Sequence, residues 1–259
     1  MNIIILGTSG SGKGTQAKLL CGKLGLNYVS MGDILRAAAK NRVDIDETIN
    51  KKGELVPDEI TYSVLRDYLE SKNIVDNILF DGYPRSARQY NFLKTWLTKK
   101  GKQFDLALLL EISDKEAIRR LSARRIDRKT GEIYNLITDP PPEKLSKGNL
   151  FIRDDDKPNA IKKRLQWYKD TTNPFIKILK KDGILIKIDG ERPIDTIFVD
   201  IMRQINEAST GLHPGYLLPA LRREQNPSEA KISSLSSTSL CSRFFAKGDK
   251  DSDAKKNQN

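Results

Sequence analysis

One glycine-rich segment near the N-terminus restricts the fold of this chain more than any other feature: Gly-Thr-Ser-Gly-Ser-Gly-Lys-Gly-Thr at residues 7–15. The apolar run at residues 2–6 is typical of a short buried parallel strand, and residues 16–20 have the pattern of a helix. Glycines allow positive φ angles and a close approach of the backbone to an anion. The N–H groups of the loop and the helix N-terminus then point at a phosphate, where Lys13 adds positive charge. The segment predicts a phosphate-binding loop; a glycine-rich turn without a ligand is the alternative.

Short apolar and β-branched runs predict a five-stranded sheet. Because helical patterns or long insertions separate these runs, we expect an α/β fold with a parallel, helix-covered sheet. Such sheets bind ligands at the carboxyl ends of their strands, and the polar segments at residues 7–15, 30–33, 81–85 and 189–190 all follow strands. This coincidence predicts a single shared site. The expected strands are residues 2–6, 27–30, 77–81, 106–112 and 184–188.

Two insertions and two long helices complete the expected domain. The insertion at about residues 30–59 is mostly helical, with short helices at 33–40 and 45–52. The insertion at residues 124–156 is polar, carries hairpin signals and is flanked by arginines, which is typical of a lid. One long amphipathic helix is expected at residues 160–181 and a last one at 194–208.

Composition limits the class of protein. With 259 residues, 38% hydrophobic and 31% charged, the chain has the size and balance of a soluble α/β domain with insertions and a tail. No run approaches the ~20 apolar residues of a membrane span, and we expect no secretory signal because the sequence enters a predicted strand at residue 2. Two cysteines, Cys21 and Cys241, do not make a disulfide framework or metal knuckle, so a reducing cytoplasm is the expected location. The one histidine, His213, argues against chemistry with a histidine base.

The formal net charge of +11 admits several interpretations. A basic chain can bind nucleic acid or polyphosphates, or it can have a basic surface without a function. Most of the excess lies before residue 209. Residues 209–259 include a serine-rich run and too little apolar sequence to fold alone, so we expect a disordered extension whose partner, if any, is unknown.

Arginines provide the second signal. Arginine binds phosphate through a planar, bidentate fork, and transfer of a phosphoryl group between two nucleotides gathers much negative charge. Each arginine alone has a simpler explanation, as a solvated or ion-paired helix residue. Six arginines stand beside a strand end or an insertion boundary: Arg36, Arg85, Arg120, Arg124, Arg153 and Arg164.

Several motifs together resemble the adenylate kinase family of nucleoside monophosphate kinases over about residues 1–208. Its loop ends in Gly-Lys-Gly-Thr, with Gly14 directly after the lysine and Thr15 next. The other matching motifs are Gly-Asp-Ile-Leu-Arg at 32–36, Asp-Gly-Tyr-Pro-Arg at 81–85 followed by Gln89, Arg-Leu-Ser-Ala-Arg-Arg at 120–125, Arg-Asp-Asp at 153–155 and Arg-Leu at 164–165.

The resemblance implies a fold and a set of roles. The fold is a P-loop NTPase-like five-stranded parallel sheet flanked by helices, with an AMP-binding insertion and a lid. The catalytic residues would be Lys13, Arg85, Arg120, Arg124, Arg153 and Arg164. ATP would be bound by Gly10, Ser11, Gly12, Lys13, Gly14, Thr15, Arg120, Arg124 and Arg192. AMP would be bound by Met31, Arg36, Leu55, Val56, Gly82, Arg85, Gln89, Arg153 and Arg164.

The resemblance also implies a metal and a reaction. Asp81 would hold Mg²⁺ through water, with ATP. The lid lacks a four-cysteine set, so no structural zinc is expected, and a polar network around Asp127, Thr130 and Asn135 could hold the lid instead. The implied reaction is ATP + AMP to two ADP. Nothing in the sequence suggests an oligomer, so we expect a monomer, without a membrane or nucleic-acid partner.

Two alternatives stay open at this point. Met31 stands where many adenylate kinases have a threonine beside the AMP base, so a UMP or CMP kinase is the nearest one, although Gln89 favours adenine. The basic charge also allows a non-catalytic nucleotide or nucleic-acid binder. A panel of AMP, GMP, CMP and UMP would decide between the kinases, and salt-sensitive RNA binding with no kinase activity would favour the binder.

Overall fold

The computed structural model describes residues 1–46, 56–145 and 147–211. Contacts between Cα atoms divide the chain into two units, Met1–Ala208 and Ser209–Asn259. The first unit contains all the predicted site residues. The expected disorder of residues 209–259 falls almost wholly outside the described residues, as does most of the short helix expected at 45–52.

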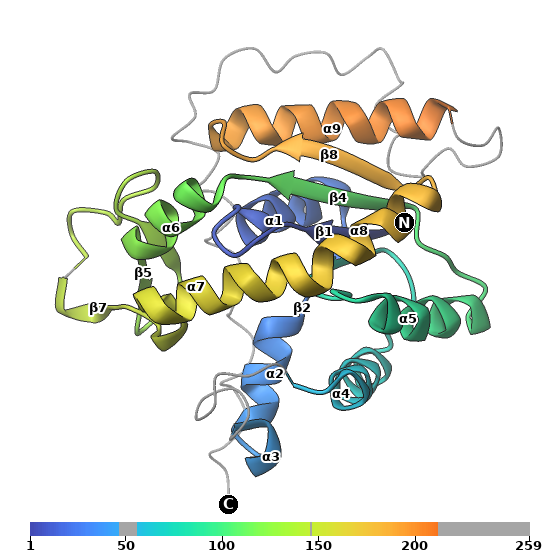
Figure 1. Cartoon of the computed structure of the whole chain (residues 1–259), viewed down its shortest axis with the longest axis horizontal. Coiled ribbons are helices and arrows are strands. Elements are labelled where there is room, and N and C mark those ends of the chain that lie inside the picture. Colours follow the sequence, from blue (N-terminus) through green and yellow to red (C-terminus); the bar gives the residue numbers. More distant parts are fainter. Residues whose placement is uncertain (47–55, 146, 212–259) are drawn as a thin grey trace, which may run out of the picture. The chain divides into compact units, whose positions relative to one another are not determined.

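The core of the first unit is a five-stranded parallel sheet in the order β2-β3-β1-β4-β8 (Figure 1). This confirms the predicted fold class, and each strand begins and ends within one residue of its expected bounds. The register aligns Ile5 of β1 with Asp81 of β3, and Asp81 with Ser30 of β2. The carboxyl ends of these three adjacent strands therefore lie side by side at one edge of the sheet. The strands are β1 Asn2–Leu6, β2 Asn27–Ser30, β3 Ile78–Asp81, β4 Leu106–Glu111 and β8 Leu185–Asp189.

Helices cover both faces of this sheet because its strands are apolar on both sides. In β1, Ile4 and Leu6 belong to one core cluster, whereas Ile3 and Ile5 are equally buried and point to the opposite face. Figure 1 shows α7 and α8 end to end across the front of the sheet. The helices of this layer structure are α1 Lys13–Leu24, α5 Ala87–Lys99, α6 Asp114–Ala123, α7 Pro158–Trp167, α8 Asn173–Lys181 and α9 Ile194–Gly211.

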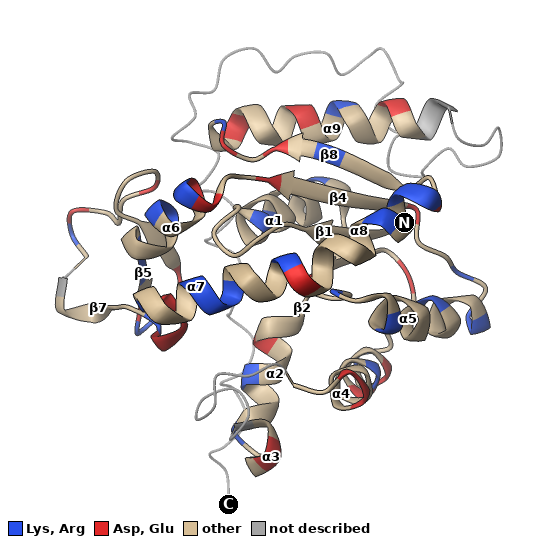
Figure 2. Cartoon of the chain, in the orientation of Figure 1, with Lys and Arg blue, Asp and Glu red and all other residues tan. Residues whose placement is uncertain are grey.

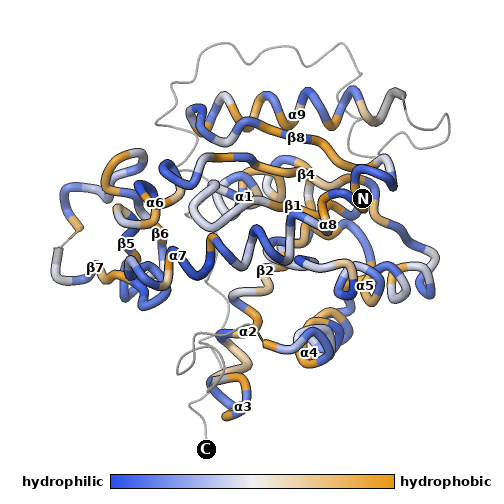
Figure 3. The backbone as a smooth tube through the Cα atoms, in the orientation of Figure 1, coloured by the Kyte–Doolittle hydropathy of each residue, from blue (hydrophilic) through white to orange (hydrophobic). Residues whose placement is uncertain are grey.

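Helix α9 shows how periodicity sets the buried face. Ile197, Ile201 and Ile205 recur every four residues and are all buried, whereas Val199, half a turn away, is 65% exposed. Figure 3 shows the resulting alternation of hydrophobic and hydrophilic residues along the helix. This last amphipathic helix was predicted from residue 194.

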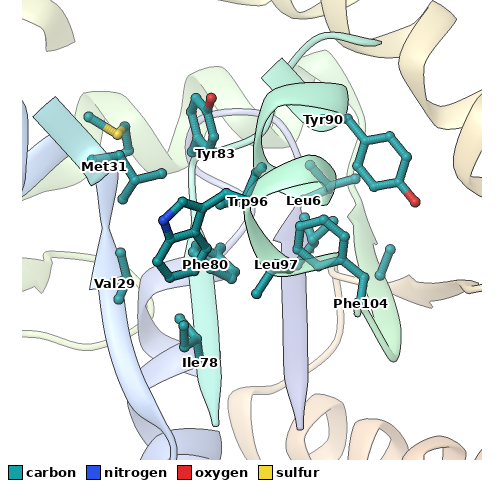
Figure 4. Packing of buried hydrophobic residues seen from close by; sticks show 14 of the residues in the cluster. Leu6, Val29, Met31, Ile78, Phe80, Tyr83, Tyr90, Trp96, Leu97 and Phe104 are labelled. Atoms are coloured by element: carbon teal, nitrogen blue, oxygen red, sulfur yellow. The ribbon is translucent and has the colours of Figure 1, made fainter. Parts of the chain in front are cut away.

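An aromatic cluster fills the front face of the sheet (Figure 4). The Phe104 ring stacks on Tyr90 at 5.3 Å between centroids and meets Phe80 edge-on at 5.9 Å. Tyr90 also lies 5.4 Å from Phe175 of α8, and its hydroxyl donates to Asp182 at 2.8 Å. These contacts pack α5 and α8 against the strands. The strands that carry the polar loops are thereby held in place.

Two groups of smaller elements extend from the sheet. Helices α2 Met31–Ala39 and α3 Val43–Asp46 lie in the first predicted insertion, and α4 Asp58–Ser71 begins at its end and continues beyond it. The second contains a separate antiparallel sheet in the order β6-β5-β7. Its elements are β5 Arg124–Asp127, β6 Ile133–Asn135, β7 Leu150–Phe151 and the 3₁₀ turns η2 Lys147–Asn149 and η3 Asp154–Asp156.

The structure corrects two helix predictions. The helix expected at 160–181 is interrupted by a π-helical turn, Tyr168–Thr172, between α7 and α8. Pro174 has no N–H to donate to the carbonyl four residues before it, and the Asn173 N–H bonds to the carbonyl of Tyr168, five residues back. Helix α2 begins at Met31 instead of residue 33, because Ser30 caps it by accepting from the Asp33 N–H at 3.4 Å.

Within the described part of the chain, every helix is too short or too polar to cross a membrane.

Candidate active site

The glycine-rich loop connects β1 to α1 and wraps the N-terminus of that helix. Gly10 and Gly12 have φ angles of 85° and 90°, in the left-handed region that suits glycine, and Gly12 is the N-cap of α1. Lys13 is the first residue of α1, and its ammonium donates to the Thr8 carbonyl at 2.9 Å across the loop. Ser11, within the loop, is fully buried, and Thr15 is exposed on the first turn of α1. The loop thus has the backbone form and the lysine of an anion-binding site.

Several of the predicted site residues lie close enough to Lys13 to change the pKa of its ammonium. Loss of water around the ammonium lowers its pKa from 10.5 to about 8. Asp81 acts in the opposite direction, whereas the positive charges of Arg85, Arg164 and Arg124 lower the pKa further. A protein that gathers this much positive charge in one place has a site for a strongly anionic ligand.

Gly14 and Asp81 lie close together between β3 and the start of α1. A Cβ atom on Gly14 would lie 3.6 Å from Asp81 Oδ2 and 3.7 Å from the hydroxyl of Tyr28, which donates to the same carboxylate oxygen at 2.8 Å. One hydrogen-bonded carboxylate beside a phosphate loop suits Mg²⁺, which keeps much of its water and binds through one or two carboxylates plus phosphates. Asp81 therefore fits the predicted role of holding Mg²⁺ through water.

Two adjacent aspartates hold three of the predicted arginines. Asp156 accepts from Arg124 Nε at 2.7 Å, and Asp155 lies 3.0 Å from Arg153 Nε and 3.1 Å from Arg164 Nη1. Burial and the neighbouring arginines lower the pKa of Arg153 to about 10, with Asp155 acting in the opposite direction. Figure 2 shows basic residues on α7, the helix that follows this acidic turn. The carboxylates orient the guanidinium groups and leave a net positive cluster.

A second group of predicted residues lies around β3, α2 and α5. Arg85 donates from Nε to the Gly82 carbonyl at 2.7 Å. Gly82 has φ 76°, and a Cβ there would lie 3.0 Å from Arg85 Nη2, so only glycine suits this turn. Arg36 forms an ion pair with Asp33 one helical turn away. Both guanidinium groups are held at the edge of the sheet.

The residues predicted to bind the AMP base differ in their burial and in their hydrogen bonds. Met31 and Val56 are buried, and Leu55 lies outside the described residues. Gln89, in the first turn of α5, is 9% exposed. Its amide oxygen accepts from the Arg85 N–H at 2.7 Å, and its amide nitrogen donates to Asp58 at 2.6 Å.

Arg120 and Arg192 lie on other sides of the loop. Arg120 Nη1 is 4.0 Å from the position of a Cβ on Gly12, and its Nε donates to Glu116 at 2.6 Å. Two arginines hydrogen-bond that carboxylate and lower the pKa of Glu116 to about 2. Arg192 follows β8 and pairs with Asp200 of α9 at 2.6 Å.

Polar contacts hold the small antiparallel sheet. Asp127 is 2% exposed and accepts from the Thr130 hydroxyl at 3.1 Å and from the Lys129 N–H at 2.9 Å. Asn135 donates to the Arg120 carbonyl at 3.0 Å and accepts from the Ile137 N–H at 2.9 Å. These are the residues predicted to form a polar network. Among residues 1–46, 56–145 and 147–211, no cluster of three histidine, cysteine or acidic side chains is arranged to hold a metal ion.

Sequence reasoning missed the partners that position the site. Tyr28, Asp58, Glu116 and Asp156 each hold a predicted functional residue, yet none belongs to a motif by itself. The only available signal was position: Asp156 ends an aspartate run between arginines, and Tyr28 lies two residues from a strand end.

Comparison with known proteins gives a consistent result. A family model described as adenylate kinase matches residues 5–184. The adenylate kinase of Methanothrix thermoacetophila is 38% identical over 214 residues, which is 80% of this chain and 99% of that protein. Those of Thermosipho africanus and Shouchella clausii are 34% and 33% identical, and the match spans 99% of each. This chain belongs to the adenylate kinase family.

Proposed function

We propose that this chain catalyses the reversible transfer of a phosphoryl group from ATP to AMP, which yields two ADP. The observation that carries the proposal is the convergence on Lys13 of Asp81, Arg85, Arg124 and Arg164, from segments far apart in the sequence. A nucleoside triphosphate and a nucleoside monophosphate that face each other phosphate to phosphate need a site of this kind. Membership of the adenylate kinase family supports the same reaction.

The donor half of the site would be the loop. The backbone N–H groups of residues 10–15 and the Lys13 ammonium would bind the phosphates of ATP, with the N-terminus of α1 behind them. Arg120 and Arg192, beside the loop and after β8, would lie nearer to the ATP base. Asp81, fixed by Tyr28, would hold Mg²⁺ through water, and the ion would neutralise charge on the β- and γ-phosphates.

The acceptor half would be the edge formed by β3, α2 and α5. Arg36 and Arg85 would bind the AMP phosphate, and Met31, Leu55, Val56, Gly82 and Gln89 would surround its base. The Gln89 amide can offer one N–H and one oxygen to the Watson–Crick edge of adenine. This pairing favours AMP over UMP, whose base presents the opposite donor and acceptor pattern, and the acceptor panel below decides between AMP and CMP.

The transfer itself would depend on alignment and charge. No side chain has to act as a strong base, because the attacking AMP phosphate is already an anion. Arg124, Arg153 and Arg164, oriented by Asp155 and Asp156, would stabilise charge on the transferring group.

Exclusion of water would decide whether ATP reacts with AMP or is hydrolysed. We propose that the insertion at residues 30–59 closes over AMP and that residues 124–156 close over ATP. Residues 1–208 would then act as a core with two moving parts.

The acceptor panel tests this proposal. With MgATP as donor, AMP should be phosphorylated with a kcat/KM at least about tenfold above those of GMP and UMP, because the oxo and N–H groups of guanine and uracil present the opposite pattern to the Gln89 amide. CMP, whose 4-amino group and N3 match the amide but whose ring is smaller, should also be a poorer acceptor than AMP. A preference for UMP or CMP would overturn the substrate. Salt-sensitive RNA binding without any phosphoryl transfer would overturn the enzyme and favour a nucleic-acid binder.

A further inference from the structure

Asp58 joins the start of α4 to the start of α5. It is the first residue of α4, after the N-cap Pro57. Its Oδ1 accepts from Gln89 Nε2 at 2.6 Å, and its Oδ2 accepts from the Ser86 hydroxyl at 3.1 Å. Both carboxylate oxygens therefore accept hydrogen bonds from residues at the start of α5, which lie 28 and 31 residues away in the sequence.

The other side of Gln89 is fixed as well. Its Oε1 accepts from the Arg85 N–H at 2.7 Å, and Ser86, the N-cap of α5, accepts from the Gln89 N–H at 3.2 Å. An ionised carboxylate only accepts and a peptide N–H only donates. A rotated Gln89 amide would place oxygen against oxygen at Asp58 and N–H against N–H at Arg85, so this arrangement allows one orientation.

The orientation of an amide determines which purine edge it can bind. The Watson–Crick edge of a 6-aminopurine presents a donor at position 6 and an acceptor at N1. A 6-oxopurine presents an acceptor at position 6 and a donor at N1. A glutamine amide matches either edge, but only after its oxygen and nitrogen exchange places. A glutamine that is free to rotate cannot tell the two apart.

We infer that Asp58 is a specificity-determining positioning residue, which holds the Gln89 amide so that the acceptor site selects 6-aminopurine over 6-oxopurine nucleotides. The inference rests on the proposed placement of the AMP base against Gln89. After the contacts to Asp58 and Arg85, the amide keeps one N–H and one lone pair of its oxygen. Those two groups are the ones that a 6-aminopurine edge requires.

Asp58→Asn is the direct test, because asparagine has the same shape and can both donate and accept. Its amide can hold Gln89 in the original or the rotated orientation. The measurement is kcat/KM for AMP and for IMP, which differ only in the 6-amino and 6-oxo edge, with MgATP as donor. We expect the AMP-to-IMP ratio to fall about tenfold, within the range for one bidentate base contact, while KM for ATP stays within about twofold.

Glu59→Gln is the matched control. Glu59 is the next residue of α4 and pairs at the surface with Arg88, which is next to Gln89 in α5. This variant loses the same charge from the same helical turn without touching the amide, so its AMP-to-IMP ratio should equal that of the wild type. Asp58→Ala, which leaves the amide held by the Arg85 N–H alone, should lower the ratio by less than Asp58→Asn.

The outcomes separate the inference from the proposed function. An unchanged ratio in folded Asp58→Asn and Asp58→Ala would overturn the role of Asp58, as would an equal loss for ATP and AMP. If the wild type transfers nothing to AMP, the proposed function fails, and calorimetric binding of AMP and IMP to the same variants still tests the amide. There, too, the AMP preference should fall about tenfold in Asp58→Asn only.

Discussion

At the scale of single residues, the site consists of cations whose partners set their charge and position. The Lys13 ammonium bonds to its own loop, and three arginines act on it from other segments. The sequence was sufficient to name Lys13, Arg85 and Gln89, because each belongs to a motif. The residues that fix them, such as Asp58 and Tyr28, could not be predicted, because hydrogen bonds between distant segments depend on the folded geometry.

The pKa of Lys13 predicts proton uptake when ATP binds. Its pKa in the free protein, about 8, is below the ordinary 10.5, so about half of the lysines are neutral at pH 8. Phosphates favour the charged form and raise the pKa, so binding at pH 8 should take up about half a proton, and much less at pH 6.5. Calorimetry in two buffers of different ionisation enthalpy measures this number.

Lys13→Arg is the control for proton uptake, because arginine stays protonated at these pH values. Any uptake that remains in this variant comes from other groups. Equal uptake in the wild type and in Lys13→Arg would contradict the assignment of the pKa near 8 to Lys13.

We expect the Arg85→Ala variant to lose catalytic activity but to keep its fold. Among the residues that the structure describes, the Arg85 side chain makes one hydrogen bond, to the Gly82 carbonyl, and the residue is exposed. Removal of a phosphate-facing arginine should lower kcat/KM by about 10³-fold, by analogy with other phosphoryl-transfer arginines. A coupled assay measures the activity and circular dichroism the fold. Arg88→Ala, three residues further along and paired with Glu59 at the surface, should keep near-normal activity.

At the scale of elements, the strands were predictable and the helix details were not. The five strands are apolar runs, and the burial of Ile3, Ile4 and Ile5 on both sheet faces explains why the runs are continuous. The π-helical turn at Tyr168–Thr172 could not be predicted from apolar periodicity, although Pro174 was the visible cause. The ion pairs, too, appear only in the structure: Asp155 and Asp156 form a turn that orients Arg124 of β5, Arg164 of α7 and Arg153, which directly precedes the turn.

Asp156→Asn should destabilise the fold. The Asp156 side chain is 1% exposed and that of Arg124 is 17% exposed, so the variant leaves a largely buried guanidinium without the negative charge that lies 2.5 Å from it. Removal of one member of such a pair lowers the free energy of unfolding by about 3 kcal/mol. Denaturant unfolding measures this change.

Asp154→Asn provides the comparison within the same turn. Asp154 is 93% exposed and pairs only with Lys157 among the ion pairs of the described residues. Its replacement should change the free energy of unfolding by less than about 0.5 kcal/mol. Equal losses for the two variants would contradict the structural role given to Asp156.

At the scale of the whole molecule, the site gathers segments that are far apart in the sequence. The loop at residues 7–15 and the β3 end at 81–85 lie together because parallel strands end at the same side of the sheet. Arg124 and Arg164, which the acidic turn η3 holds, add their charge near Lys13 from outside the parallel sheet. The rule for parallel sheets made the convergence of the strand ends predictable. It did not predict which charges would neutralise each other there.

Truncation after residue 211 tests how much of the chain the reaction needs. The curated relatives match about 80% of this chain and nearly their whole length, and every proposed site residue lies before residue 193. The truncated protein should therefore keep kcat/KM for ATP and AMP within about twofold of the full chain. A loss of more than tenfold would show that residues 212–259 contribute to catalysis.

The fate of the γ-phosphoryl group tests the central claim most directly. With ATP labelled in that group, the full-length protein, Mg²⁺ and AMP, the label should appear in ADP, with little free phosphate and no transfer without AMP. This result is expected because a water-excluding site with two nucleotide halves delivers the group to AMP alone. Label released as inorganic phosphate, or transfer that does not depend on AMP, would contradict the account.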